Sequence, residues 1–270
     1  MTEADAIARS ETPATIESLA ADLRELGVRE GSTLLVHSSL SSLGWVCGGP
    51  EAVVLALQRA VGDNGTLVMP AQTGGNSEPE FWEHPPVPAD WWPLIREHAP
   101  PFDARSTPTR NMGAIAECFR TMPGVARSSH PQVSFTAWGR YARAILADHR
   151  LANGLGEESP LARVYDLEGD VLLLGVEHNR NTSLHLSEYR ANWPGHKPRQ
   201  QGAAMMVDGM RMWVRFDELD KTTSDFNEIG WDFVQVGQVK TGKVACAKAQ
   251  LMPQRALVDF GAQWISNHRK

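Results

Sequence analysis

Three segments of the chain share one hydrophobic pattern. Residues 29–39 (REGSTLLVHSS), 63–73 (DNGTLVMPAQT) and 167–178 (LEGDVLLLGVEH) each run from a glycine turn through an unbroken apolar stretch into a polar end. A short apolar run without polar alternation is typical of a strand that is buried on both faces of a sheet. We therefore predict three strands in the interior of a sheet that is covered by helices.

Helical periodicity alternates with these strands. We predict helices over residues 16–26, 50–62 and 182–192; the first two end at a glycine, and the third ends before Pro194. The alternation of strands and helices predicts an α/β fold, a three-layer α/β/α domain with a central, mostly parallel sheet. Residues 1–270 are expected to form this single domain.

One segment departs from the alternation. Residues 74–103 contain too many prolines for regular structure and hold Trp82, Trp91 and Trp92. Long irregular loops in compact domains are usually functional, so we interpret this segment as a lid-like insertion.

A second departure lies near the C-terminal third of the chain. Asp208-Gly209 is a strong two-residue hairpin signal within residues 203–216. An acidic run with five acids and one lysine follows at residues 217–228, either as a solvated loop or as a wall that attracts cations. We predict a small added β-hairpin region and an acidic loop over residues 203–228.

Polar residues stand where each predicted strand ends, at residues 37–39, 71–73 and 177–179. Ligands of open α/β sheets collect at the carboxyl ends of the strands, so we expect the functional site there.

Composition narrows the class of protein. The net charge of -6 and the absence of a basic stripe disfavour nucleic acid and favour a cationic ligand. No apolar run reaches the ~18 residues of a membrane helix, which predicts no membrane segment. The polar N-terminus lacks the pattern of a secretory signal, and three widely spaced cysteines suit a cytoplasmic location. Of these, Cys47 is interpreted as an inert thiol.

The loop over residues 37–52 is rich in serine and glycine but lacks the lysine of a phosphate-binding loop. It is either a cradle for a phosphate or amide-rich cofactor arm at a helix N-terminus, or a serine-rich connector.

His185 and Glu188 are three residues apart and share one face of the predicted helix. A histidine that a carboxylate orients is the minimal general-base arrangement, although a structural histidine fits the same pattern. His178 precedes the helix and need not converge with His185, and no His-x3-His pair is present, so we predict no metal site.

Four collinear stretches, LLVHSSLSSLG, TLVMPAQTGGNS, residues 107–139 and residues 156–191, resemble the aminoglycoside 3-N-acetyltransferases. The resemblance extends over residues 15–240 and implies a three-layer α/β domain with a small added β region. It also implies acetyl transfer from acetyl-CoA to the 3-amino group of a 2-deoxystreptamine aminoglycoside, and hence antibiotic resistance. The implied protein is a monomer or homodimer that binds this small cation.

The resemblance assigns residues to roles. The motif NTSLHLSE, close to the family's NTSLHLAE, places the catalytic histidine on His185 and its acid on Glu188. Backbone N–H groups at residues 37–39 are expected to stabilise the thioester oxyanion. The implied residues that contact coenzyme A are His37, Ser38, Ser39, Leu40, Ser42, Ser106, Thr107, Arg110, Met112 and Gly113.

The acceptor side follows from the same resemblance and from the charge of the substrate. Glu177 stands where relatives often have glycine, and it either raises the pKa of the histidine or contacts a cation. The other residues expected on the acceptor side are Gln72, Asn76, Trp82, Trp92, Asp217, Asp220 and Asp225.

Other functions remain open at this level. The chain is alternatively an acetyltransferase for another small amine, a non-catalytic aminoglycoside-binding protein or, more distantly, a metal-dependent hydrolase. The sequence leaves open which aminoglycosides are accepted, which acid orients His185, and the oligomeric state.

Overall fold

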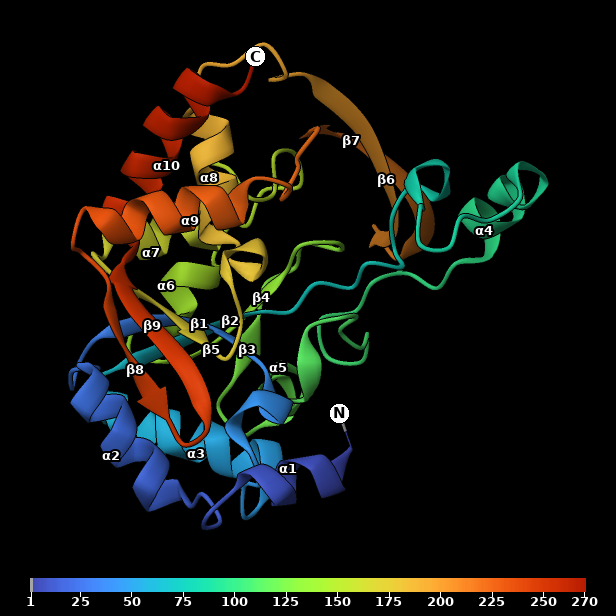
Figure 1. Cartoon of the computed structure of the whole chain (residues 1–270). Helices are drawn as coiled ribbons and strands as arrows, with labels where there is room; N and C mark the ends of the chain where they lie inside the picture. Colours follow the sequence, from blue (N-terminus) through green and yellow to red (C-terminus); the bar gives the residue numbers. More distant parts are fainter. Residues whose placement is uncertain (1) are drawn as a thin grey trace.

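The computed structural model describes residues 2–270, and a mixed sheet of seven strands forms the centre of this part of the chain (Figure 1). The three predicted strands are β1 (Thr33–Ser38), β2 (Thr66–Pro70) and β5 (Asp170–Leu174). β1 lies between the other two and runs parallel to both. All residues of β2 and β5 are buried, which confirms the interpretation of their unbroken apolar runs.

Antiparallel strands extend this parallel core on both sides. β4 (Phe135–Gly139) pairs with β2, and β3 (Ala126–Arg127) forms the edge beyond it. On the other side β9 (Ala247–Pro253) pairs with β5, and β8 (Lys240–Val244) forms the second edge. The sequence pattern did not predict these four strands, but the α/β class and its parallel core are confirmed.

Helices cover both faces of the sheet, as the alternating directions of strand side chains require. Leu34 and Val36 pack into one layer, whereas Leu35 packs into the other. The first layer contains α2 (Ile16–Leu26), α3 (Gly49–Val61) and α5 (Gly113–Thr121); the second contains α6 (Ala142–Leu146), α7 (Pro160–Asp166), α8 (Ser183–Arg190), α9 (Phe226–Gln235) and α10 (Gln254–His268) (Figure 1).

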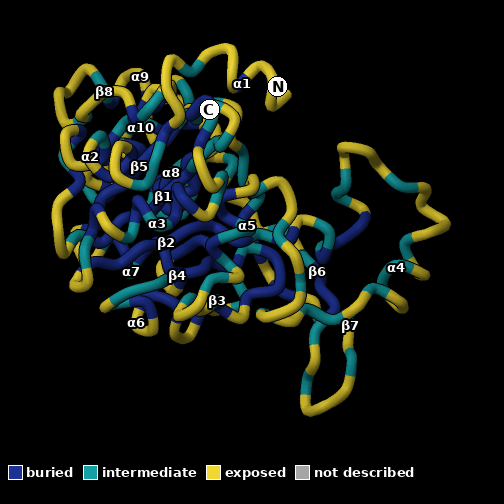
Figure 2. The backbone as a smooth tube through the Cα atoms, turned by 90° about the horizontal axis from the view of Figure 1, so that it is seen from below, coloured by how far each residue is buried: buried dark blue, intermediate teal, exposed yellow. Residues whose placement is uncertain are grey.

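The predicted hairpin consists of β6 (Pro198–Val207) and β7 (Met210–Leu219), and its turn is Asp208-Gly209. Both turn residues have positive φ, 48° and 77°, as a two-residue hairpin turn of this type requires. Together with residues 74–103 the hairpin forms a lobe that stands away from the sheet (Figure 2). We call residues 74–103 and 198–219 the lobe.

Backbone and amide hydrogen bonds to one residue of β6 join the two parts of the lobe. The Asn76 side chain donates to Ala204 O at 3.0 Å and accepts from Ala204 N at 2.8 Å. Phe102 N donates to the same carbonyl at 2.9 Å, so both ends of the insertion are attached to the hairpin.

Two expectations about irregular structure were wrong. The insertion contains a helix, α4 (Trp92–His98), because its proline occupies the first turn, where a missing N–H costs no helical hydrogen bond. Residues 217–228 are not a single loop, since β7 extends to Leu219 and α9 begins at Phe226.

Among residues 2–270, no helix is both long enough and apolar enough to cross a membrane.

Candidate active site

The chain turns sharply where β5 ends. Gly175 has φ 71°, and a Cβ there would lie 2.4 Å from Ser42 Cβ, so a glycine is required at this crossing. A short 3₁₀ helix, η4 (His178–Arg180), then leads into α8. This path brings the first turn of α8 beside the carboxyl end of β1.

His185 and Glu188 form a dyad on α8. His185 Nδ1 lies 2.5 Å from Glu188 Oε2, and Glu188 is fully buried. The other carboxylate oxygen, Oε1, accepts from Arg269 Nη1 at 2.7 Å and from Thr222 N at 3.0 Å. Burial acts to raise the pKa of Glu188, but the hydrogen bond and charge of His185, with Thr222 N–H and Arg269, hold it below its usual value.

The tautomer of His185 follows from this pairing. Since an ionised carboxylate only accepts hydrogen bonds, the proton between the two side chains belongs to His185 Nδ1. Nε2 is then the basic nitrogen, and it has no hydrogen-bond partner within residues 2–270. The Phe226 ring packs edge-on against the imidazole at 5.0 Å, which limits its rotation.

His37 lies next to this dyad at the end of β1. It is buried, and its Nε2 lies 3.4 Å from Thr182 Oγ1. Burial, and to a smaller degree the neighbouring His178 and His185, lower the pKa of His37 to about 3. His37 is therefore neutral at physiological pH and does not compete with His185 for a proton.

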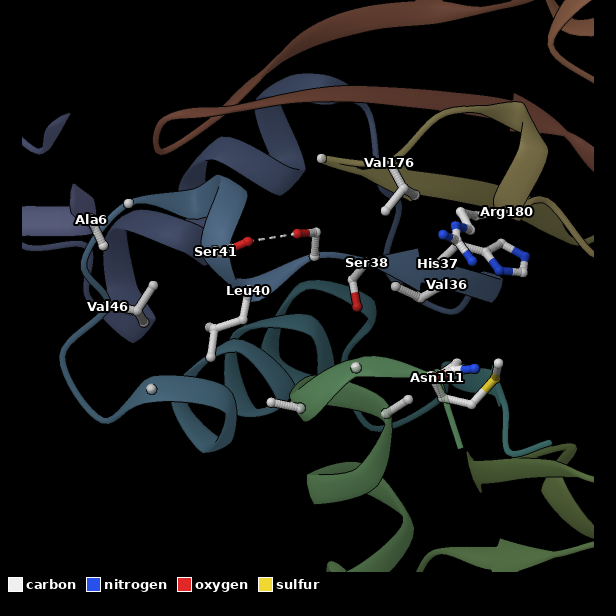
Figure 3. A pocket seen from close by; sticks show the side chains of 18 of the residues that line it. Ala6, Val36, His37, Ser38, Leu40, Ser41, Val46, Asn111, Val176 and Arg180 are labelled. Carbon is white, nitrogen blue, oxygen red and sulfur yellow. Dashed lines mark hydrogen bonds between the residues drawn. The ribbon is translucent and has the colours of Figure 1, made fainter. Parts of the chain in front are cut away.

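A cavity of about 800 Å³ opens at the end of β1 (Figure 3); His37 and Thr182 line it, whereas His185 and Glu188 do not. Its walls come from the segment after β1, from the starts of α3 and α5, from η4, and from α1 (Glu3–Arg9). Six of the ten residues predicted to contact coenzyme A line it together: His37, Ser38, Ser39, Leu40, Met112 and Gly113.

The other four predicted residues do not line this cavity. Ser42 Oγ donates to Gly175 O at 3.0 Å and supports the turn after β5. Ser106 and Thr107 bond with Asp103 and close a turn at the end of the insertion. Arg110 is exposed and packs along Gly74, 3.3 Å from the position of a Cβ there.

Two helices begin at the cavity. Gly49 is the first residue of α3 and Gly113 the first of α5, and both line the cavity. Gly49 N–H donates to Val46 O at 3.0 Å and Pro50 has no N–H, so free N–H groups are expected from the N-terminus of α5. Sequence reasoning missed Arg180, whose exposed side chain also lines the cavity. The same strand-end rule that selected His178 could have selected it.

The backbone after β1 supplies fewer free donors than expected. Ser39 N–H already donates to Leu174 O at 2.9 Å in the pairing with β5. The N–H of Ser39 is therefore not free to bind an oxyanion.

Most uncharged residues expected on the acceptor side already have partners in the lobe. Asn76 holds Ala204 through both atoms of its amide, and Trp82 Nε1 donates to Ser77 Oγ at 2.8 Å. Trp92 lies under the Arg96 guanidinium, 5.9 Å from the ring centre. Gln72 follows β2 and is half-buried.

The acids expected on the acceptor side differ in their freedom. Asp225 pairs with Arg269, and Asp220 pairs with Arg199 at 3.0 Å. Asp217 is exposed on β7 and has no ionic partner within the described residues. Glu177 is exposed too, and its carboxylate accepts from Asn227 Nδ2 at 3.1 Å, so it does not contact the dyad.

His178 is part of the packing between η4 and α9. A Cβ on Gly230 would lie 2.2 Å from its ring, and burial lowers the pKa of His178 to about 4. In the part of the chain from residue 2 onward, no three His, Cys, Asp or Glu side chains are arranged to hold a metal ion.

Comparison with known proteins identifies the family. Residues 35–266 match the model of the aminoglycoside 3-N-acetyltransferase family. The chain is 45% identical to the SPbeta prophage-derived aminoglycoside N(3')-acetyltransferase-like protein YokD of Bacillus subtilis, over 95% of this chain and 94% of that protein. It is 36% identical to aminoglycoside N(3)-acetyltransferase VII of Streptomyces paromomycinus, over 98% and 96%.

Solved structures agree with the sequence matches. The crystal structure of Bacillus subtilis YokD has a TM-score of 0.95 at 43% identity and 98% coverage of both chains. AAC-IIIb in a binary complex with CoASH has a TM-score of 0.86 at 32% identity, covering 96% of this chain and 98% of that one. AAC-VIa with bound sisomicin has a TM-score of 0.86 at 30% identity, covering 96% and 100%. The chain therefore belongs to the aminoglycoside 3-N-acetyltransferase family and is an acetyltransferase.

Proposed function

We propose that the chain transfers an acetyl group from acetyl-CoA to the 3-amino group of an aminoglycoside, with His185 as general base. The observation that carries this proposal is the dyad, in which Glu188 leaves His185 Nε2 as a basic nitrogen near His37, and His37 lines the cavity at the end of β1. A base in this position suits a reaction that must remove a proton from an amine.

The cavity has the size and the donors for the coenzyme. The helix N-terminus at Gly113 offers free N–H groups to anions, and the Arg180 guanidinium adds positive charge. These groups would hold phosphate oxygens, while Leu40 and Met112 offer apolar contacts to the pantetheine arm. The complex of AAC-IIIb with CoASH supports this assignment by similarity.

The chemistry assigned to the chain's own residues is proton removal and orientation. His185 Nε2 accepts one proton from the ammonium group of the acceptor, and the resulting imidazolium is stabilised by Glu188. The neutral amine then attacks the acetyl carbonyl, so a C–N bond forms, the C–S bond of the thioester breaks, and the nitrogen of the new amide loses its second proton to solvent. The thiolate leaving group takes the proton, which returns His185 to its neutral form.

Positive charge on the acceptor is the reason to expect acidic contacts. Asp217 is an exposed acid of the lobe without an ionic partner among residues 2–270, and Asp220 is half-exposed beside Arg199. We assign both to the acceptor side, together with Gln72, Trp82 and Glu177. The sisomicin complex of AAC-VIa supports an aminoglycoside as the acceptor by similarity.

Release of coenzyme A tests this function. Gentamicin, kanamycin, neomycin and apramycin are each supplied with acetyl-CoA to wild-type protein and to His185→Gln. We expect turnover of at least one drug, a loss of about 10³-fold or more in kcat for the variant, and nearly unchanged binding of coenzyme A.

Two results would replace the proposal with one of its alternatives. Release with other small amines but with none of the four drugs would retain the acetyltransferase and change its acceptor. Drug binding without turnover, unaffected by His185→Gln, would indicate a sequestering protein.

A further inference from the structure

Arg269 has a side chain that is only 8% exposed. It follows α10 directly, and its N–H donates to Ile265 O at 3.0 Å, which continues the last helical turn. Arginine side chains are almost never buried unless they are paired. The burial of this one therefore requires a reason in its contacts.

The guanidinium of Arg269 connects two carboxylates. Nη1 donates to Glu188 Oε1 at 2.7 Å, while Nε and Nη2 each donate to Asp225 at 2.7 Å. The Trp193 ring lies 4.8 Å from the guanidinium carbon and covers one face of it. The planar guanidinium group of arginine has five N–H donors and can bind two carboxylates at once in this way. The ammonium group of a lysine cannot.

Glu188 connects Arg269 to His185, the proposed base. Glu188 uses Oε1 for Arg269 and for Thr222 N, and it uses Oε2 for His185 Nδ1. The carboxylate is therefore held at both oxygens, and it cannot rotate without losing hydrogen bonds in a fully buried place.

We propose that Arg269 is a positioning residue for acetyl transfer, which holds Glu188 charged and oriented so that His185 Nε2 faces the acceptor amine. The proposal rests on the assignment of His185 as the base. Arg269 would act on the reaction through a carboxylate that lies 81 residues away in the sequence.

The charges around the dyad give this role a distinct signature. Glu188 and Asp225 are the carboxylates on this side of His185, and Arg269 is the cation between them. His37 and His178, on β1 and η4, are neutral at pH 7, because burial lowers their pKa values to about 3 and 4. Removal of the guanidinium leaves two uncompensated carboxylates, which favour the imidazolium form of His185.

The sign of the effect on catalysis follows. His185 acts as the neutral imidazole. When the pH is lowered, a variant that favours the imidazolium form therefore begins to lose activity at a higher pH than the wild type does. Asp225→Asn removes one carboxylate and leaves surplus positive charge, so it shifts the acidic limb of the kcat profile in the opposite direction. A purely structural contact would produce neither shift.

The experiment compares Arg269→Gln, Arg269→Lys and Asp225→Asn with Arg255→Ala. Arg255 lies on α10 and pairs with Glu168 at the surface, so it is a matched control for loss of an ion pair from the same helix. For Arg269→Gln we expect a loss of about tenfold in kcat, an unchanged KM for acetyl-CoA, and an acidic limb at higher pH. Arg269→Lys should restore the position of the limb, and Arg255→Ala should match the wild type.

The proposal is overturned if folded Arg269→Gln keeps the wild-type kcat and the wild-type limb. If that variant does not fold, an unchanged limb in Asp225→Asn overturns it equally. His185→Gln distinguishes failure of this proposal from failure of the proposed function. If His185→Gln is active, His185 is not the base. If His185→Gln is inactive and Arg269→Gln behaves like the wild type, only the role of Arg269 is wrong.

Discussion

The site at the strand ends and the lobe are built in different ways. The dyad lies on a helix in the packed second layer, and buried groups satisfy both oxygens of Glu188. The lobe stands away from the sheet (Figure 2), and its insertion is joined to its hairpin by hydrogen bonds of Asn76 and Phe102 to Ala204 and of Arg211 to the carbonyls of Arg96 and Ala99. The part assigned to chemistry lies within the packed layers, and the part assigned to acceptor choice stands outside them.

This difference separates reaction from specificity. Catalytic groups must be held within a fraction of an ångström, which packed elements achieve better than loops do. Surface segments tolerate change, so acceptor preference can vary while the dyad is kept. Substitutions at the dyad should therefore affect kcat, and substitutions in the lobe should affect KM for the acceptor.

The largest effect is expected at Glu188. Glu188→Gln removes the carboxylate that fixes the tautomer of His185 and stabilises its imidazolium, while Arg269 keeps its partner Asp225. We expect a loss of about 10³-fold in kcat with nearly unchanged binding of coenzyme A. Steady-state kinetics and calorimetric titration with coenzyme A provide the test. A loss of coenzyme binding of similar size would mean that the residue shapes the cavity instead.

A smaller effect, a loss of stability at low pH, is expected from two histidines near the end of the hairpin. His130 and His149 stack at 4.8 Å, His130 meets Phe216 of β7, and His149 Nε2 lies 2.6 Å from Gly154 O. Burial lowers their pKa values from 6.5 to about 4 and about 3.

The sign follows from proton uptake. Between the unfolded value and these folded values the unfolded chain binds more protons, so the free energy of unfolding falls as the pH drops below 6.5. Urea denaturation at stepwise lower pH should show this loss, and His149→Gln should flatten it. A profile identical to that of the wild type would remove these histidines from the explanation.

A third effect concerns the attachment of the insertion. Asn76→Ala removes two hydrogen bonds to Ala204, which should cost about 1–3 kcal/mol locally. We expect faster amide exchange at residues 198–207 and a higher KM for the acceptor, with kcat changed little. Glu80→Ala, at an exposed position of the same insertion, is the control. A fall in kcat without a change in KM would contradict the separation of the two regions.

The smallest effect is expected at Glu177. Its carboxylate contacts Asn227 and is exposed, so Glu177→Gln should leave kcat within about twofold of the wild type. The pH profile of kcat is the measurement. A displaced acidic limb would show that this acid acts on His185 after all.

The sequence predicted those parts of the fold whose signal is local. Unbroken apolar runs identify β1, β2 and β5 because strands buried on both faces need no polar alternation, and Asp208-Gly209 identifies its turn through backbone conformation. The outer strands escaped prediction. In β9, for example, small and polar residues interrupt the apolar ones, and the pattern of burial is set by α2 and β8 packed against it.

The sequence predicted the site residues that lie in family motifs. It could not predict which polar side chains bind other residues of the fold instead of a substrate. His185 and Glu188 are adjacent on one helix, so their contact follows from spacing. Asn76 and Asp225 have the polarity expected of substrate contacts, but the fold gives them Ala204 and Arg269 as partners. Nothing in a local pattern distinguishes a free polar side chain from a paired one, and nothing local connects Arg269 to Glu188.

The central claim is that His185 Nε2 faces the reacting end of a coenzyme bound in the cavity at the end of β1. A crystal structure with coenzyme A tests it most directly. We expect the thiol sulfur within about 5 Å of Nε2, with space between them for one amine nitrogen. A coenzyme bound outside the cavity, or a sulfur directed away from α8, would contradict the account.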